Sequence, residues 1–274
     1  MLPKTPLPPC YVIHEQGVNS EISTVSVNPD YGLLFTTKGS FKMEQSYTTQ
    51  SVTGSITIVP YGVPYRSVAG CNLDYWLLGF SAESYGLNET QEIMRPFAEV
   101  RSGGAPVANL NVPAQQRITS WFEALKQETN FETTISNDVQ RSLIVLILTE
   151  VVRATTVIDN KITKSPLVGK ALHYIQKYSL TPISLSDVAS AVGRTSPHVA
   201  SVVKSETGFT VGMWITSARL AKAAQLLQYS NMSVEQITTK IGWQDTTHFI
   251  RQFKTFYGTT PSKWRNKLRS KSEH

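Results

Sequence analysis

The chain has 274 residues, of which 41% are hydrophobic and 17% charged, enough apolar sequence for two or more compact domains with buried cores. Its two cysteines form neither a disulfide framework nor a metal-binding motif, and no stretch approaches the roughly 20 apolar residues that span a bilayer, so we expect a cytoplasmic protein without a metal or other cofactor. The net charge of +6 is unevenly divided along the chain. Residues from 165 onward hold 14 Lys and Arg against 5 Asp and Glu, a charge of +9, which leaves −3 for residues 1–164. This asymmetry favours a nucleic-acid-binding C-terminal domain.

Residues 11–107 are predicted to be β structure. Short apolar runs alternate with Gly, Pro and Asn at near-regular spacing, which is typical of an antiparallel barrel or sandwich. The clearest runs are residues 32–37, 41–49, 55–60 and 74–80. The segment GSITIVPYGVPYRS (residues 54–67) resembles part of a cupin, in which a strand enters a Pro-Gly-x-Pro turn. Metal-binding cupins have a histidine after the second proline, where this chain has Tyr65, so we expect a cupin-like barrel over residues 1–112 that holds no metal.

Several aromatic and hydrogen-bonding side chains of this region are candidates for a ligand pocket. Small-ligand sites combine an apolar lining with a few placed polar groups, and a tryptophan beside a tyrosine suits the face of a sugar. The strongest candidates are Tyr31, Lys38, Tyr65, Arg66 and Trp76, with Tyr47 and Tyr75 completing the set. The alternative is that these aromatic residues only fill the core of a barrel that serves dimerisation or contact with another protein.

Two helices are predicted after the barrel, over residues 113–128 and 137–154. In the second, LIVLIL (residues 143–148) is apolar around the whole helix, so it must be covered on two sides. Its own barrel and partner helix can cover it, or a second subunit can. We expect residues 113–155 to form a helical hairpin and favour a homodimer formed through it. Residues 156–166 are predicted to be the linker to the C-terminal domain.

The last third of the chain contains the same unit twice. Residues 183–214 align with residues 232–264, and Gly193 falls on Gly242. A repeat of this period indicates one supersecondary unit used twice. Each copy starts with a serine followed three residues later by Asp or Gln, which predicts a capping box, and each glycine predicts a left-handed turn that ends a short helix. Each copy is therefore predicted to be a helix-turn-helix.

The second helix of each copy, over residues 196–207 and 246–257, is the predicted reading helix. One face is apolar at helical spacing and is expected to be core, while the opposite face is small, polar or basic and can enter a major groove about 12 Å wide. Between the copies, residues 211–228 predict a helix of about 27 Å, which could hold the reading helices near one DNA turn apart. The residues expected to contact DNA are Ser196, Pro197, Ala200, Ser201, Lys204, Thr246, Thr247, Ile250, Arg251 and Lys254.

Residues 172–265 resemble the double helix-turn-helix module of the AraC/XylS family of bacterial transcription regulators. The most specific part is GWQDTTHFIRQFKTFYGTTPSKWR (residues 242–265), which fills nearly every position of the terminal motif of the family, with His248 where an aromatic residue is commonest. The first copy departs from the pattern, because Ser201 stands where members often carry arginine and Val203 replaces the usual phenylalanine.

The resemblance implies a DNA-binding domain over residues 167–270 and a transcription regulator, such as an activator, with RNA polymerase as a partner. It also implies a small organic effector, with a sugar among the candidates, bound in the barrel. A ligand-independent regulator is the main alternative. An enzyme is not expected, because no catalytic spacing of acidic or nucleophilic residues emerges, and two cysteines cannot supply the zinc cluster of an alkyl-transfer DNA-repair protein.

Overall fold

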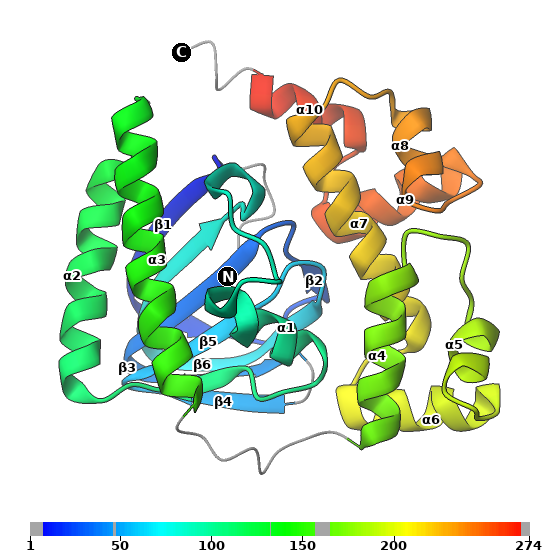
Figure 1. Cartoon of the computed structure of the whole chain (residues 1–274), viewed down its shortest axis with the longest axis horizontal. Coiled ribbons are helices and arrows are strands. Elements are labelled where there is room, and N and C mark those ends of the chain that lie inside the picture. The colour runs from blue at the N-terminus through cyan, green and yellow to red at the C-terminus, as the bar shows by residue number, and fades with distance from the viewer. Residues whose placement is uncertain (1–7, 46–47, 132, 157–164, 270–274) are drawn as a thin grey trace.

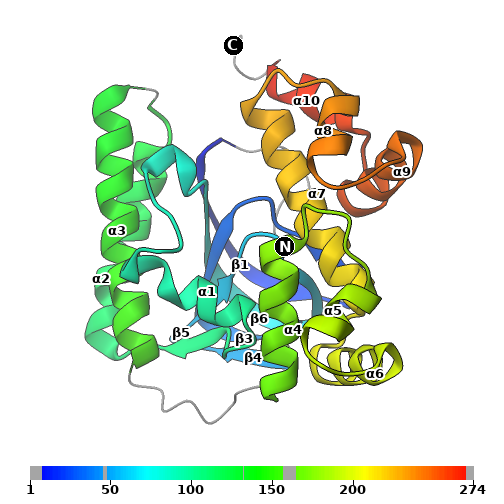
Figure 2. The same ribbon diagram turned by 45° about the vertical axis from the view of Figure 1, so that its right-hand side comes forward.

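The structure is a computed structural model that describes residues 8–45, 48–131, 133–156 and 165–269 (Figure 1). A helical hairpin of α2 (Val112–Glu128) and α3 (Thr134–Thr156) covers one side of a β-sheet. On the other side of the sheet, Figures 1 and 2 show the helical C-terminal domain, with α4 (Pro166–Tyr178) and α7 (Val211–Tyr229) nearest to it. The expected order of a β domain followed by an α domain is confirmed.

The sheet is antiparallel and has the strand order β1, β6, β3, β5, β7, with β2 also paired to β6 and β4 to β3. Among the described residues this path of hydrogen-bonded neighbours does not return to its start, so the expected barrel is an open sheet instead of a closed ring. The strands are β1 (Cys10–Ser20), β2 (Ser26–Val27), β3 (Tyr31–Glu44), β4 (Thr48–Val52), β5 (Ser55–Val59), β6 (Pro64–Phe80) and β7 (Val107–Asn109).

Two of the predicted strands belong to one element. Residues 32–37 and the start of 41–49 both lie in β3, which continues through Gly39. The pairing of β3 with β6 shifts register on both sides of Lys38, so the glycine lies at an irregularity within a long strand and not in a turn. The second run then continues beyond the end of β3 to the beginning of β4, across residues 46–47, which lie outside the described part of the chain.

The main core of the N-terminal domain lies between the sheet and the hairpin. Side chains on one face of the sheet meet apolar side chains of both hairpin helices, and most of them are fully buried. Burying a large apolar side chain stabilises a fold by about 1.5–3 kcal/mol, so this contact fixes the hairpin on the sheet. Its fully buried members on the sheet and the hairpin include Leu33, Phe35, Ile56, Leu78, Ile118, Phe122, Ile144 and Ile147.

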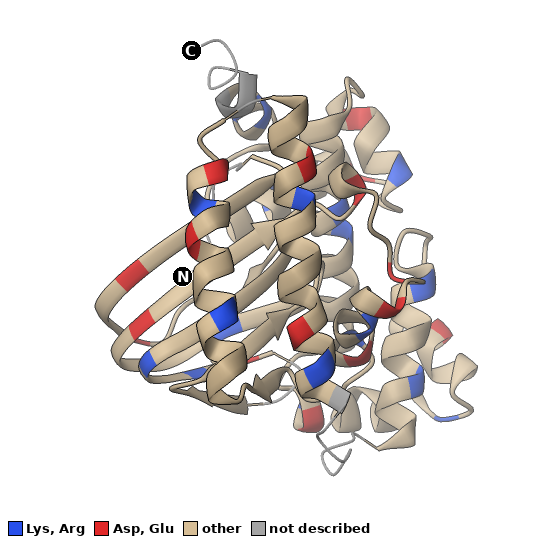
Figure 3. Cartoon of the chain, turned by 60° about the vertical axis from the view of Figure 1, so that its left-hand side comes forward, with Lys and Arg blue, Asp and Glu red and all other residues tan. Residues whose placement is uncertain are grey.

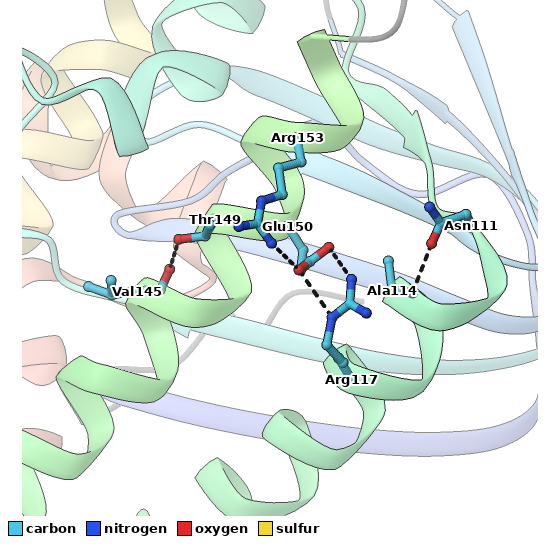
Figure 4. Close-up of polar contacts among 7 residues, drawn as sticks. All are labelled: Asn111, Ala114, Arg117, Val145, Thr149, Glu150 and Arg153. Carbon is cyan, nitrogen blue, oxygen red and sulfur yellow. Dashed lines mark hydrogen bonds and ion pairs between the residues drawn. The ribbon is translucent and has the colours of Figure 1, made fainter.

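An ion-paired cluster joins the two hairpin helices (Figure 4). Arg117 of α2 donates to both carboxylate oxygens of Glu150 in α3, at 3.2 and 3.0 Å, and Arg153 donates to the same carboxylate at 2.9 Å. The hydrogen bonds from Arg117, more than any other contact, lower the pKa of Glu150. Asn111 caps the first turn of α2 by accepting from the Ala114 amide at 2.9 Å.

Helix α3 carries an exposed apolar stripe although it packs on the sheet. Ile135, Val139 and Leu146 remain 76%, 38% and 42% exposed, at spacings that place them along one side of the helix. Residues 142–149 contain no charge, and Figure 3 shows α3 uncharged between a pair of charged residues near each end. The part of the chain that the structure describes leaves this side uncovered.

The remaining elements are three short helices between β6 and β7 and the helices of the C-terminal domain. The short helices η1 (Glu83–Tyr85), η2 (Glu92–Met94) and α1 (Arg95–Arg101) follow β6. The predicted linker falls mostly on residues 157–164, which lie outside the described residues. After α4 come α5 (Leu185–Ala191), α6 (Ser196–Thr207), α7, α8 (Val234–Lys240), α9 (Thr246–Tyr257) and α10 (Pro261–Arg269). Within the described ranges, no helix is long and apolar enough to cross a membrane.

Candidate nucleic-acid interface

Both predicted helix-turn-helix units form, each with the expected cap. The Ser184 amide donates to the Asp187 carboxylate at 2.8 Å, and the Ser233 amide donates to the Gln236 side chain at the same distance. These reciprocal caps fix where α5 and α8 begin, since they satisfy amides that have no partner within the helix. The glycines that follow both have the predicted left-handed backbone, with φ of +65° and +80°.

Each unit has its own apolar core, and α7 contributes to both. Val199 and Val203 of α6 are fully buried with residues of α4, α5 and the first turns of α7. In the second unit, Phe249 and Phe253 of α9 are fully buried with residues of α8, α10 and the rest of α7. Helix α7 has 19 residues and is therefore about 28 Å long. It holds α6 and α9 at separate positions on one domain.

The outer faces of α6 and α9 are open. Pro197, Ser201 and Lys204 are exposed on α6, and Thr247, Arg251 and Lys254 are exposed on α9. The other predicted contact residues, Ser196, Ala200, Thr246 and Ile250, are half-buried, and Ile250 also packs against the core of the second unit.

The basic side chains on these faces have no acidic partner among the residues that the structure describes. No carboxylate of the described residues forms an ion pair with Lys204, Arg251 or Lys254. Asp245 accepts from the Thr247 amide at 2.8 Å and so orients the first turn of α9. An exposed, unpaired basic face on a helix is the arrangement that contacts phosphates and base edges in the major groove.

A shallow hollow at the start of α6 adds residues that the sequence analysis did not select. It is lined by Ser190, Gly193, Arg194, Thr195 and His198. Arg194 and His198 are exposed beside the reading face, so they extend the basic and hydrogen-bonding surface of the first unit. The signal was a lone arginine in the turn, and selecting residues by helix face alone passed over it. Arg265, in contrast, donates to the Met232 and Leu227 carbonyls at 2.6 and 3.3 Å and so holds α10 in place.

The N-terminal domain contains a second candidate site, a cavity on the side of the sheet opposite the hairpin core. Its free space is about 40 Å³, which is room for a few water molecules. Most of its walls are apolar, and the Ser20 and Ser67 hydroxyl oxygens inside it are 3.2 Å apart. The lining residues are Val18, Ser20, Ser23, Ser26, Leu34, Phe41, Met43, Thr57, Val59, Tyr65, Ser67, Leu73, Tyr75 and Leu77.

The structure does not bring the predicted ligand residues together. Tyr65 lines the cavity, as does Tyr75, whose hydroxyl donates to Glu15 at 2.6 Å. Arg66 is directed to Glu44, with which it pairs at 2.5 Å, and Lys38 is exposed at the irregularity in β3.

Two further candidates lie elsewhere in the domain, and one lies outside the described residues. The ring of Trp76 lies in the hairpin core, stacked on His14 with centroids 3.9 Å apart. The hydroxyl of Tyr31 donates to Glu89 at 2.8 Å, beside the guanidinium of Arg101. Tyr47 lies outside the described part of the chain.

Comparison with known proteins places the C-terminal units in a known domain family. The family described as helix-turn-helix domain matches residues 188–267. The xylose operon regulatory protein of Escherichia coli K12 is 31% identical over 108 residues, which cover 39% of this chain and 28% of that protein. The regulatory protein PocR of Salmonella typhimurium is 29% identical over 118 residues, 41% of this chain and 39% of its own length. The chain thus spans well under half the length of these relatives.

A solved structure is similar over both domains. ToxT from Vibrio cholerae O395, crystallised with (E)-4-(8-methylnaphthalen-1-yl)but-3-enoic acid, aligns with a TM-score of 0.50 and 12% identity. The alignment covers 94% of this chain and 98% of that chain. At this identity the likeness shows the fold, which is a β domain followed by the helical domain.

Proposed function

We propose that this chain, whose C-terminal third is a double helix-turn-helix domain of the AraC/XylS type, is a sequence-specific DNA-binding transcription regulator. The observation that carries the proposal is the pair of reading helices with exposed, unneutralised basic faces, held apart by α7. A length of about 28 Å for α7 brings α6 and α9 near the roughly 34 Å that separates major-groove segments on one face of a duplex.

Within this interface the side chains have different roles. Arg251 is the long basic residue in the middle of the α9 face, and an arginine there can form two hydrogen bonds to guanine. Lys204 and Lys254 lie at the C-terminal ends of their helices, where a flexible ammonium group is suited to phosphate contact. Because α6 has Ser201 where α9 has Arg251, the first unit contributes more to positioning and less to sequence recognition.

We also propose that two subunits pair through α3. The exposed stripe of Ile135, Val139 and Leu146 and the uncharged residues 142–149 make a surface whose burial would be favourable. A dimer presents four reading helices and doubles the length of DNA that is recognised. We propose that the DNA-bound dimer changes transcription by contacting RNA polymerase.

The cavity of the N-terminal domain is the proposed effector site. Its lining of Leu, Val, Phe and Met side chains with a few hydroxyl groups favours a mainly aliphatic or aromatic ligand with one polar group over a sugar. Because its free space is only about 40 Å³, such a ligand must displace strands or side chains to enter. This small volume also favours the second candidate, a ligand-independent regulator whose cavity is filled by its own side chains.

Titration with n-octanol and with octanoate separates these candidates. A saturable change in the thermal midpoint of the full chain, lost when Leu77→Trp fills the cavity, supports the effector site. The absence of saturable binding by either probe, with a normally folded protein, supports the ligand-independent regulator.

Selection of DNA from a random library by the full chain tests the DNA-binding function. We expect an enriched sequence, and Arg251→Ala should weaken binding to it by about 1–3 kcal/mol and relax preference at one position. Lys42→Ala, at an exposed lysine of β3, removes a charge away from α9 and should leave selection unchanged. Enrichment of no sequence, or equal loss on selected and random DNA, would contradict the assignment.

A further inference from the structure

The N-terminal domain inserts valines into the cores of both helix-turn-helix units. Val27 is 4% exposed and packs within the cluster of α7, α8, α9 and α10, which is the core of the second unit. Val63 is 1% exposed and packs within the cluster of α4, α5, α6 and α7, which is the core of the first. Val25 lies against both clusters. The β domain therefore contacts the interior of both units at once.

These valines belong to two segments, residues 25–28 and 61–65, which we call the brace. The segments pair as antiparallel strands, with Ser26 opposite Tyr65, and the Gly62 amide donates to the Asn28 carbonyl at 3.1 Å. Backbone hydrogen bonds therefore join the two halves of the brace into one unit.

The brace approaches α7 closely at the point where the two units join. Gly62 has a φ of +74°, and a side chain added there would lie 3.4 Å from the Ala218 Cα. Glycine permits this backbone conformation and the close approach. Nearby, the Gln225 side chain of α7 donates to the Pro29 carbonyl at 3.0 Å. The first turns of α7 belong to the core of the first unit and its later turns to that of the second, so the approach of Gly62 to Ala218 lies between the two cores.

The opposite face of the brace lines the cavity. Ser26 and Tyr65 are cavity residues, while Val25 and Val27, on either side of Ser26, pack on the C-terminal domain. Successive side chains of a strand point to opposite faces. A ligand or a larger side chain in the cavity that displaces Ser26 therefore also displaces Val25 and Val27, which pack on the C-terminal domain.

We propose that the brace couples the cavity to the relative position of the two reading helices. With the cavity closed, Val63 and Val27 hold the two units in one arrangement, and a change on the cavity side of β2 moves one unit against the other. Its regulatory meaning rests on the DNA-binding function proposed above, but the mechanical coupling does not. Packed interfaces of this kind shift between discrete arrangements because their cores are not continuously deformable.

The distance between nitroxide labels on α6 and α9 tests the coupling without DNA. Exposed Ser205 and Thr255 are changed to cysteine in the full chain, with exposed Cys71→Ser, while Cys10 is buried and remains unlabelled. We expect one narrow distance distribution in this parent. Val27→Ala together with Val63→Ala should broaden it or shift its mean by more than its own width. Val52→Ala, an exposed valine of β4, is the matched control and should change nothing.

A second variant acts from the cavity side and leaves the valines in place. Ser26→Leu places a larger side chain in the cavity. We expect this variant also to shift the distance between the labels on α6 and α9. Thermal melts show whether the valine double variant and Ser26→Leu are folded. If only one of them folds, its label distance alone decides the test. An unchanged distribution in either folded variant overturns the coupling. Failure to enrich DNA with the distances behaving as expected would instead overturn the DNA-binding function and leave the coupling standing.

Discussion

Replacement of Asp30 by asparagine should make the protein more stable at alkaline pH. Asp30 is 4% exposed, at the end of the loop before β3, and no described group donates a hydrogen bond to its carboxylate. Burial raises the pKa of Asp30 from 3.8 to about 7. Burial, with a smaller contribution from the Asp30 charge, raises the pKa of the Tyr229 and Tyr257 hydroxyls of the C-terminal domain. Because Gln225 of α7 donates to the carbonyl of the adjacent Pro29, Asp30 is buried beside a contact between the two domains.

The sign of the effect follows from the raised pKa. The folded protein holds the Asp30 proton more tightly than the unfolded chain does, so the contribution of Asp30 to stability is fully present below about pH 4 and is lost as the pH rises through about 7. The pKa of Asp30 is raised by about three units, and at 1.36 kcal/mol per unit this corresponds to a loss of ~4 kcal/mol from the free energy of unfolding above pH 7. This is an upper bound, because local relaxation and water entry reduce the cost of the buried charge.

Denaturant unfolding of the parent and of Asp30→Asn between pH 5 and pH 8 measures the effect. The free energy of unfolding of the variant should exceed that of the parent increasingly up to about pH 7 and by a constant amount above it. Because all other groups titrate in both proteins, the difference isolates Asp30. Asp138→Asn, at an exposed residue of α3, should show no such difference. A difference between parent and Asp30→Asn that does not change with pH would refute a buried, proton-binding carboxyl group.

Two further predictions concern the DNA interface and the dimer. With a charge of +9 on the C-terminal part and two inserted helices, we expect each subunit to neutralise about 6–8 phosphates. The slope of the logarithm of the DNA-binding constant against the logarithm of the salt concentration should then be around −5 to −7. A slope near −2 would mean that one unit alone engages the duplex. Leu146→Glu places a charge in the exposed stripe of α3 and should convert dimers into monomers in sedimentation velocity, whereas Gln116→Glu on the exposed side of α2 should not; a parent that already sediments as a monomer would remove the proposed dimer.

The C-terminal half could be predicted from the sequence in detail. Helices α6 and α9 begin and end at the predicted residues, and α7 extends one residue beyond its prediction. The repeat made this possible, since both copies carry the same serine cap before the first helix and a glycine after each of the two helices. Helices α4 and α10 were not predicted: α4 lies before the first repeated segment, and α10 begins at the end of the second and continues beyond it, so their starts are marked only by a Ser-Pro and a Thr-Pro pair.

The ligand residues could not be predicted, because the sequence does not show which face of the sheet each one occupies. Tyr65 and Tyr75 line the cavity, whereas their neighbours Arg66 and Trp76 point away from it. Side chains of a strand alternate between faces, so an error of one residue exchanges the cavity for the opposite surface. The brace was also unpredicted, because its valines are distinguished only by packing on residues more than 100 positions later in the chain.

Protection of guanine N7 from methylation along a selected duplex tests the central claim most directly, because N7 lies in the major groove where reading helices contact bases. Two inserted helices per subunit predict two protected segments roughly 10 base pairs apart on one face of the duplex. In Arg251→Ala, protection should be lost in one segment and retained in the other. A single protected segment, or protection that does not depend on sequence, would contradict the account of two reading helices held by α7.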